Sequence, residues 1–105
     1  MPDFTDHIRQ AVANNDYVLT YHARTRKSER GIEEREIIET ILHGEVIERY
    51  PHDQPCPKCL FMYPVRPGEP LYISCAYDQA GQVAVIVTVH WFDPEYWLDW
   101  RTRRR

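Results

Sequence analysis

The pattern of hydrophobic and polar positions changes its period at Gly44. Before this residue apolar side chains recur at the three- and four-residue spacing of helices, and after it they alternate as in strands. The first helical face consists of Phe4, Ile8, Ala11 and Val12. It predicts a helix from about Asp3 to Ala13, with Asp3 or Thr5 as its N-cap. The chain is therefore expected to be helical in its first half and a sheet in its second.

Two further helices are expected before Gly44. A short apolar run from Tyr17 to Leu19 indicates a stub of strand. The stretch from Thr20 to Ile32 then predicts a helix that Thr20 caps and Gly31 ends. A third helix begins directly after Gly31, with acidic residues in its first turn, where the helix dipole favours them. Its buried face consists of Ile37, Ile38, Ile41 and Leu42, and Gly44 ends it.

Four strands are predicted after Gly44. They run from Val46 to Tyr50, Leu60 to Val65, Leu71 to Tyr77 and Val83 to Trp91. Turn residues at 66–70 and 78–81 separate the last three strands, which should form an antiparallel meander. The last strand is apolar on both faces as far as Thr88, so we expect an interior strand that the helices cover on one side.

A short terminal helix is predicted after the last strand, with Asp93 as its cap and Pro94 at its first position. Aromatic residues gather there, namely Trp91, Phe92, Tyr96, Trp97 and Trp100. We expect them to attach this helix to the core, while an exposed ring can also stack on a nucleic-acid base. The predicted fold is α+β: two or three N-terminal helices on one face of an antiparallel sheet of about four strands, and a short C-terminal helix.

Composition and length indicate one small intracellular domain. With 105 residues, 43% of them hydrophobic, the chain has material for a single core and is expected to form one domain over residues 1–105. No apolar run approaches the roughly 18 residues of a membrane span, and the N-terminus lacks the apolar segment of a signal peptide. We therefore expect a cytoplasmic protein without a membrane partner.

The net charge of −3 conceals two basic segments. One holds Arg24, Arg26, Lys27 and Arg30 of the second predicted helix, and the other holds Arg101, Arg103, Arg104 and Arg105 at the end of the chain. Such asymmetry is a clue to nucleic-acid contact. For the tail, residues 101–105, we favour the simpler interpretation of a frayed end. For the helix, a solvated face and a nucleic-acid contact both remain open.

The basic helix aligns a histidine with two arginines. His22, Arg26 and Arg30 follow the spacing i, i+4, i+8, so successive residues are rotated by only about 40° and form one stripe. Imidazole can act as acid or base near neutrality, and guanidinium groups bind phosphate. Thr88 and His90 lie at i and i+2 on the last strand, hence on one face of the sheet. RNA cleavage through its own 2′-hydroxyl needs only such a base, an acid and cations.

Several segments, taken in order, resemble a family of small bacterial and archaeal domains of unknown function. These are TYHARTRKSERGI, HGEVIERYP, PHDQPCPKCL, PLYISCAYD and IVTVHWFDPEYW, over roughly residues 17–98. That family looks like a relative of the RelE, MqsR and BrnT toxins and is often encoded beside an antitoxin with a YgiT-type zinc finger. The resemblance implies a RelE-like fold and the toxin of a type II toxin–antitoxin pair. Such a toxin is a metal-independent endoribonuclease without a cofactor, which cleaves RNA alone or on the ribosome.

The resemblance also bears on the site. His22, Arg26 and Arg30 match the family motif and, with Thr88 and His90, are the catalytic candidates. Candidates for RNA binding are Arg24, Lys27 and Tyr77. His90 stands where the family pattern has Tyr, and Tyr72 where it has His, so the second proton-transfer group remains open among His90, Tyr77 and others. The alternative function is a binding module for RNA or a partner protein that performs no catalysis.

The cysteines suggest a third class of function. Cys56 and Cys59 have the spacing of half a zinc knuckle, and Cys75 with His52 or His90 would complete four ligands. A second C-x-x-C pair is missing from the sequence, however, and Cys75 lies in a predicted apolar strand, where a free cysteine usually packs as a small hydrophobe. We therefore expect reduced thiols and no metal, with a small zinc-binding structural domain as the alternative.

Overall fold

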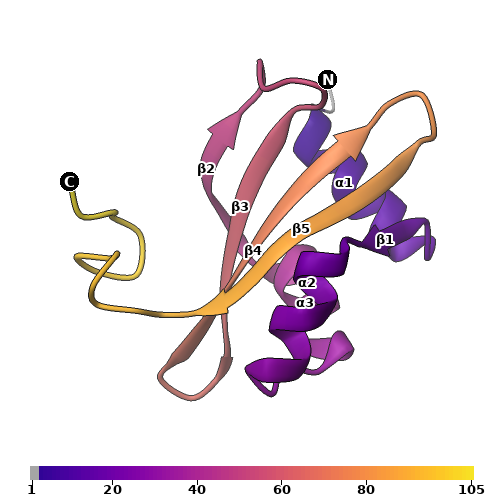
Figure 1. Ribbon diagram of the computed structural model, residues 1–105. Coiled ribbons are helices and arrows are strands. Elements are labelled where there is room, and N and C mark those ends of the chain that lie inside the picture. The colour runs from indigo at the N-terminus through magenta and orange to yellow at the C-terminus, as the bar shows by residue number, and fades with distance from the viewer. Residues whose placement is uncertain (1–2) are drawn as a thin grey trace.

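The computed structural model describes residues 3–105 (Figure 1). Its helices are α1 (Phe4–Ala13), α2 (Tyr21–Glu29) and α3 (Glu34–His43). Its strands are β1 (Tyr17–Leu19), β2 (Glu45–Tyr50), β3 (Lys58–Arg66), β4 (Glu69–Asp78) and β5 (Val83–Trp91). The order of elements confirms the predicted change from helix to strand at Gly44. No helix in residues 3–105 is long and apolar enough to cross a membrane.

The helices begin and end where the sequence predicts. Asp3 caps α1, and Thr20 caps α2 by accepting a hydrogen bond from the N–H of Ala23 at 3.0 Å. Gly31 follows α2 with φ +62°, a left-handed conformation that suits glycine. At Gly44 an added Cβ would lie 2.2 Å from a backbone carbonyl oxygen of α3, so only glycine fits where α3 turns into β2.

The sheet has five strands in the order β1-β5-β4-β3-β2. Strands β2 to β5 form an antiparallel meander, as predicted. The sequence predicted an antiparallel sheet of about four strands, and this was wrong in one respect. The sheet has a fifth strand, β1, which pairs in parallel with β5, with Val18 opposite Val85. Parallel neighbours need a long crossover connection, and here α2, α3 and the other three strands supply it.

Helices α1 and α3 pack on one face of the sheet (Figure 1). The core between them includes the fully buried residues Ile8, Ile37, Ile41, Phe61, Ile73 and Ile86. Each such side chain contributes roughly 1.5–3 kcal/mol relative to an exposed position. Helix α2 packs mainly against β5 and β1, so the predicted packing of helices on one face holds for α1 and α3.

Helix α2 lies along the edge of β5, beyond the short pairing of β5 with β1. The Thr20 hydroxyl donates to the carbonyl of Val87 at 3.1 Å, and Arg30 Nη1 donates to the carbonyl of Val89 at 2.7 Å. The indole N–H of Trp91 donates in turn to the carbonyl of Arg30 at 2.9 Å. The first two bonds satisfy carbonyls on an edge that no strand covers, and all three fix the ends of α2 against β5.

The predicted C-terminal helix is wrong. Asp93 accepts a hydrogen bond from the N–H of Glu95 at 2.9 Å, as a cap does, but the chain makes one turn and then reverses. Trp97 forms an isolated bridge with Arg103 and is 1% exposed. It packs on the sheet face opposite the helices with Leu60, Met62 and Tyr72. We call residues 92–105 the C-terminal loop; its course is set by burial of Trp97 and by the pairing of its arginines.

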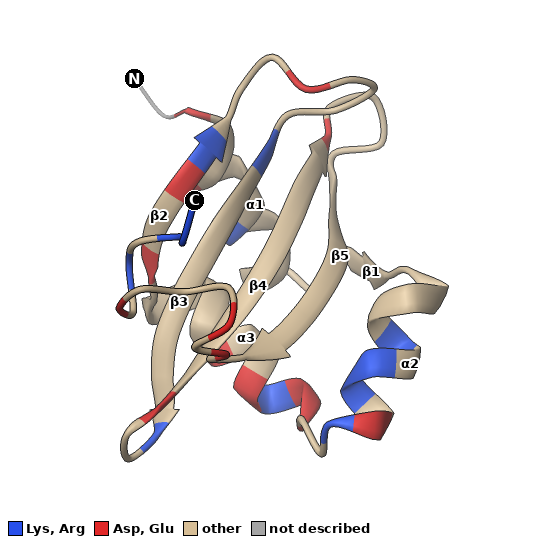
Figure 2. Cartoon of the chain, turned by 60° about the vertical axis from the view of Figure 1, so that its left-hand side comes forward, with Lys and Arg blue, Asp and Glu red and all other residues tan. Residues whose placement is uncertain are grey.

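The basic tail is not frayed, which corrects the interpretation favoured from the sequence. Arg101 Nε pairs with Glu45 of β2 at 2.8 Å. Arg103 binds both carboxylate oxygens of Glu48, at 2.8 and 3.0 Å. Figure 2 shows the positive C-terminus beside the acidic positions of β2. Part of the charge asymmetry of the sequence is therefore used to hold the C-terminal loop on the sheet.

Candidate nucleic-acid interface

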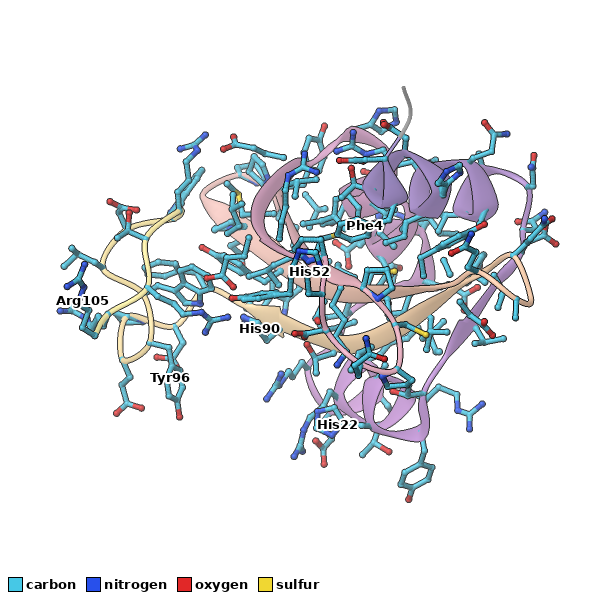
Figure 3. All side chains as sticks on the ribbon, turned by 90° about the horizontal axis from the view of Figure 1, so that it is seen from above. Phe4, His22, His52, His90, Tyr96 and Arg105 are labelled. Atoms are coloured by element: carbon cyan, nitrogen blue, oxygen red, sulfur yellow. The ribbon has the colours of Figure 1, made fainter. Side chains whose placement is uncertain are left out.

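An open groove of about 550 Å³ between α2 and the C-terminal loop contains every residue predicted to be catalytic. Its lining includes His22, Arg26 and Arg30 of α2, Thr88 and His90 of β5, and Phe92, Tyr96, Trp97 and Arg103 of the C-terminal loop. In Figure 3, His22, His90 and Tyr96 come from these three elements. The structure thus brings together residues that are far apart in the sequence.

The basic residues of α2 are divided between two of its faces. The stripe of His22, Arg26 and Arg30 lies along the groove. Arg24 and Lys27 line a second depression of about 540 Å³ instead, together with residues that include Tyr17 and Glu34. The residues predicted to bind RNA on this helix therefore lie next to the groove rather than inside it.

The two arginines of the stripe are engaged differently. Arg26 pairs with Glu29 at 2.6 Å, and both side chains are exposed, by 39% and 54%. An exposed pair contributes only about 0.2–1 kcal/mol, so an incoming phosphate can replace the carboxylate. Arg30 donates to the carbonyl of Val89 and so connects α2 to β5. Arg30 has a structural role whether or not it also contacts a ligand.

Thr88 and His90 reach the groove from a β-bulge. Ser74 lies opposite Thr88 while Cys75 lies opposite Ile86, so Val87 is an extra residue on β5. A bulge of this kind redirects the side chains beside it and is common next to functional sites. The predicted placement of Thr88 and His90 on one face of the sheet agrees with their shared position in the groove.

His90 ends a column of stacked side chains. The Tyr72 ring lies 5.1 Å from the His90 ring, with 2° between their planes. Trp97 also stacks on Tyr72, with 4.6 Å between ring centres, and the Arg103 guanidinium lies 4.7 Å from the centre of a Trp97 ring. The Tyr72 hydroxyl donates to the carbonyl of Trp100 at 2.7 Å. The orientation of the imidazole is therefore set by a rigid aromatic support.

The environment keeps His90 neutral. Burial, followed by the positive charges of Arg30 and Arg103, lowers the pKa of His90 to about 4. A neutral imidazole has one unprotonated nitrogen, which can accept a proton from a hydroxyl. It lacks the second ring proton that an imidazolium ion can donate as an acid. Burial likewise raises the pKa of Tyr72 to about 12. An anion bound near Arg30 and Arg103 would offset their effect on His90, since its charge has the opposite sign.

Tyr77 lies away from the groove, at the other end of the sheet. It pairs with Ala84 at the start of β5 and stacks on His7 of α1, with 5.4 Å between the ring centres. Tyr77 lines a separate depression, together with residues of α1 and the loops at that end. The structure therefore does not group Tyr77 with the other candidates for RNA contact.

Arg103 is a groove residue that the sequence analysis missed. Its place depends on Glu48, which lies on the strand at the far edge of the sheet, and on the ring of Trp97. The available signal was the complementarity between the acidic positions of EVIERY and the basic RTRRR tail. That complementarity alone does not say which arginine meets which acid.

Two of the three cysteines pack as core residues. Cys59 and Cys75 are direct partners across β3 and β4, and both are buried under the helices. Burial raises the pKa of the Cys59 thiol to about 12 and that of Cys75 well above its usual value. In residues 3–105, no group of three or more His, Cys, Asp or Glu side chains has an arrangement that could hold a metal ion. Cys56 is partly exposed in the loop before β3.

One family model matches the chain. It is described as a domain of unknown function (DUF4258) and covers residues 19–91, from the end of β1 to the end of β5. The matched region includes His22, Arg26, Arg30, Thr88 and His90 but not the C-terminal loop. No curated protein and no solved structure matches the chain.

Proposed function

We propose that this chain, which belongs to the family of domains of unknown function DUF4258, is an endoribonuclease that cleaves single-stranded RNA in the groove. The observation that supports this most strongly is the meeting of two histidines, His22 and His90, with Arg26 and Arg30 in one open groove. Cleavage through the 2′-hydroxyl needs a base, an acid and cations, and it needs no metal.

The two histidines suit opposite proton transfers. His90 is neutral, because its pKa is lowered to about 4, and accepts the proton of the 2′-hydroxyl while that oxygen attacks phosphorus. His22 is exposed on α2 and, in its protonated form, donates to the 5′-oxygen as the bond from phosphorus to that oxygen breaks. The products are a 2′,3′-cyclic phosphate and a free 5′-hydroxyl. A general acid or base of this kind contributes about 10²–10⁴-fold.

Cations and a hydroxyl would stabilise the charge on the phosphorane. Arg26 becomes free to contact phosphate when the ligand displaces Glu29. Arg30 is held in place by its bond to the Val89 carbonyl and keeps further N–H donors. Thr88 adds a hydroxyl from the bulge of β5. An RNA strand that continues across α2 then meets Arg24 and Lys27 in the second depression, which makes binding depend on salt.

The proposed biological role is that of the toxin of a type II toxin–antitoxin pair. This role is supported by the resemblance of the segments around His22 and Thr88 to a family that looks like a relative of the RelE, MqsR and BrnT toxins. The partner is then a cognate antitoxin, of the kind with a YgiT-type zinc finger, and the substrate is RNA either free or on the ribosome.

Expression in bacteria tests this role. The wild-type chain should arrest growth, and His22→Ala should relieve the arrest without lowering the melting temperature. His43→Ala is the matched control, because His43 lies on α3 beside Tyr63 and does not line the groove. Equal arrest by wild type and His22→Ala, or no arrest by wild type, contradicts the proposed toxin.

A second candidate function is RNA binding without cleavage. The low pKa of His90 favours it, because a base with a pKa of about 4 removes a hydroxyl proton poorly near neutral pH. In both functions RNA binds in the same cationic groove, but only the endoribonuclease cleaves it. Salt-dependent binding of RNA that stays intact would select the binding module.

A further inference from the structure

We infer that the C-terminal loop forms a nucleotide subsite of the groove, in which Arg103 contacts a phosphodiester and Tyr96 stacks on a base. This inference rests on the proposed function, because it takes single-stranded RNA as the ligand. It adds a second wall to the site, opposite the arginines of α2 and outside the family region at residues 19–91.

Arg103 is a cation held in a defined position. Its backbone pairs with Trp97, and its guanidinium lies over a Trp97 ring at 4.7 Å. Its Nε and Nη2 atoms bind Glu48, whose carboxylate also accepts a hydrogen bond from the Tyr50 hydroxyl at 2.8 Å. A guanidinium has five N–H donors, so this fork leaves others for a ligand. The side chain remains 50% exposed and lines the groove, as a phosphate contact must.

Tyr96 presents an exposed ring on a fixed backbone. Its N–H donates to the Asp93 carbonyl at 3.0 Å, and its own carbonyl accepts from the N–H of Arg104 at 2.9 Å. The residue is nevertheless 61% exposed and lines the groove, and no ring stack involves it in residues 3–105. An exposed aromatic ring and a cation that line the same groove are the combination that binds single-stranded nucleic acid through its bases and backbone.

The competing explanation is that Arg103 only fastens the tail to β2. Arg101 does this in a comparable way, since its Nε pairs with Glu45 at 2.8 Å and its side chain is 59% exposed, but it does not line the groove. Leu98 is a similar control for Tyr96, because it is 60% exposed in the same loop and also lies outside the groove lining. Within each pair, the two residues have similar exposure and lie in the same loop, but only one of them lines the groove.

The test measures binding of a fluorescent single-stranded oligodeoxyribonucleotide, which lacks the 2′-hydroxyl and stays intact, over a series of salt concentrations. Arg103→Ala should weaken binding and reduce the slope of log affinity against log salt by about 0.7, the value for one phosphate contact on a single strand. Tyr96→Ala should weaken binding about tenfold at an unchanged slope, as expected for one lost base stack. Arg101→Ala and Leu98→Ala should bind as wild type does.

Melting curves accompany each variant. If Arg103→Ala is less stable than Arg101→Ala, the deciding variant is Arg103→Lys, because it keeps the charge but not the two-point contact with Glu48. A slope of log affinity against log salt equal to that of wild type then supports the subsite. A reduced slope overturns it. Equal slopes for Arg103→Ala and Arg101→Ala, or equal affinities for Tyr96→Ala and Leu98→Ala, overturn the subsite while the proposed function stands. A wild-type protein that does not bind the oligonucleotide also overturns the subsite, whereas the proposed function is decided separately by cleavage of RNA.

Discussion

Tyr72 and His90 lie directly opposite each other on β4 and β5, with ring centres 5.1 Å apart and planes 2° from parallel. The family resemblance of the sequence led us to expect the same two residue types in the reverse order, with His in place of Tyr72 and Tyr in place of His90. Because the two positions are cross-strand partners, the exchange keeps one imidazole and one phenol in contact. His90 lines the groove and Tyr72 does not, so His90 is the second proton-transfer group in the mechanism that we propose.

The stacked pair should be energetically coupled. We expect Tyr72→His and His90→Tyr each to lower the free energy of unfolding, and the double variant to lose less than the sum of the two. Only the double variant restores a contact between imidazole and phenol, and residues in contact show coupling of about 0.5–3 kcal/mol. Urea unfolding of the four proteins measures this coupling, and strictly additive losses would contradict it.

Acid should destabilise the protein through His90. Its pKa of about 4 in the folded state lies below the ordinary value near 6.5, so between these pH values the unfolded chain binds a proton that the folded chain does not. The contribution of His90 to the free energy of unfolding is therefore intact above about pH 6.5 and is lost as the pH falls to about 4. The total loss is roughly 3 kcal/mol.

His90→Gln isolates this contribution, because it removes the titrating group and leaves the other histidines in place. The difference in free energy of unfolding between pH 7 and pH 4.5 should be smaller for the variant than for the wild type. The same difference in both proteins would mean that His90 titrates in the folded state as it does in the unfolded chain.

Arg30 and Arg26 should differ in their effect on stability. Arg30→Ala removes the donor to the Val89 carbonyl, and a hydrogen bond to a charged group contributes about 1.5–3 kcal/mol. Arg26→Ala removes only an exposed pair with Glu29 and should cost less than about 1 kcal/mol. Chemical unfolding of both variants checks this order, and equal losses would show that the bond to Val89 adds no stability. Arg26→Ala is accordingly the cleaner variant for activity.

Treatment with a metal chelator should leave the fold unchanged, because we expect no structural metal. Cys59 and Cys75 are buried with raised thiol pKa values, which suits packing residues better than ligands that must be thiolates. We expect the melting temperature to be the same with and without EDTA. Stoichiometric zinc in the purified protein, lost together with the fold in Cys56→Ser and Cys59→Ser, would contradict this and support a structural zinc domain.

The helices were predictable because their limits depend on local chemistry. A hydroxyl at Thr20 and a left-handed glycine at Gly31 set the ends of α2 with little help from the rest of the chain. The pairing of β1 was not predictable, since three residues carry too little pattern to select a partner at the other end of the sequence. Asp93 makes the side-chain hydrogen bond expected of a helix cap, but no helix follows it, because burial of Trp97 determines where the chain reverses.

The candidate site was predictable in pieces. Helical spacing aligned His22 with its arginines, and alternation placed Thr88 and His90 on one face, but only tertiary packing brings the two groups together. The position of Tyr77 away from the groove follows from the antiparallel register, which the sequence analysis did not consider. The end of β4 lies beside the start of β5, so Tyr77 faces Ala84, and Tyr72 is the residue that faces His90.

The most direct measurement is cleavage of a single-stranded oligoribonucleotide by the purified chain, free of any partner, in EDTA. The groove mechanism predicts a 2′,3′-cyclic phosphate product and no cut at a position that carries a single 2′-deoxy substitution. His22→Ala should lower the rate about 10²–10⁴-fold and Arg26→Ala about 10²–10³-fold, each with a normal melting curve, while His43→Ala should cleave as wild type does. Intact RNA with a wild-type protein that binds it, both alone and with ribosomes, or full activity of folded His22→Ala, would contradict cleavage in this groove.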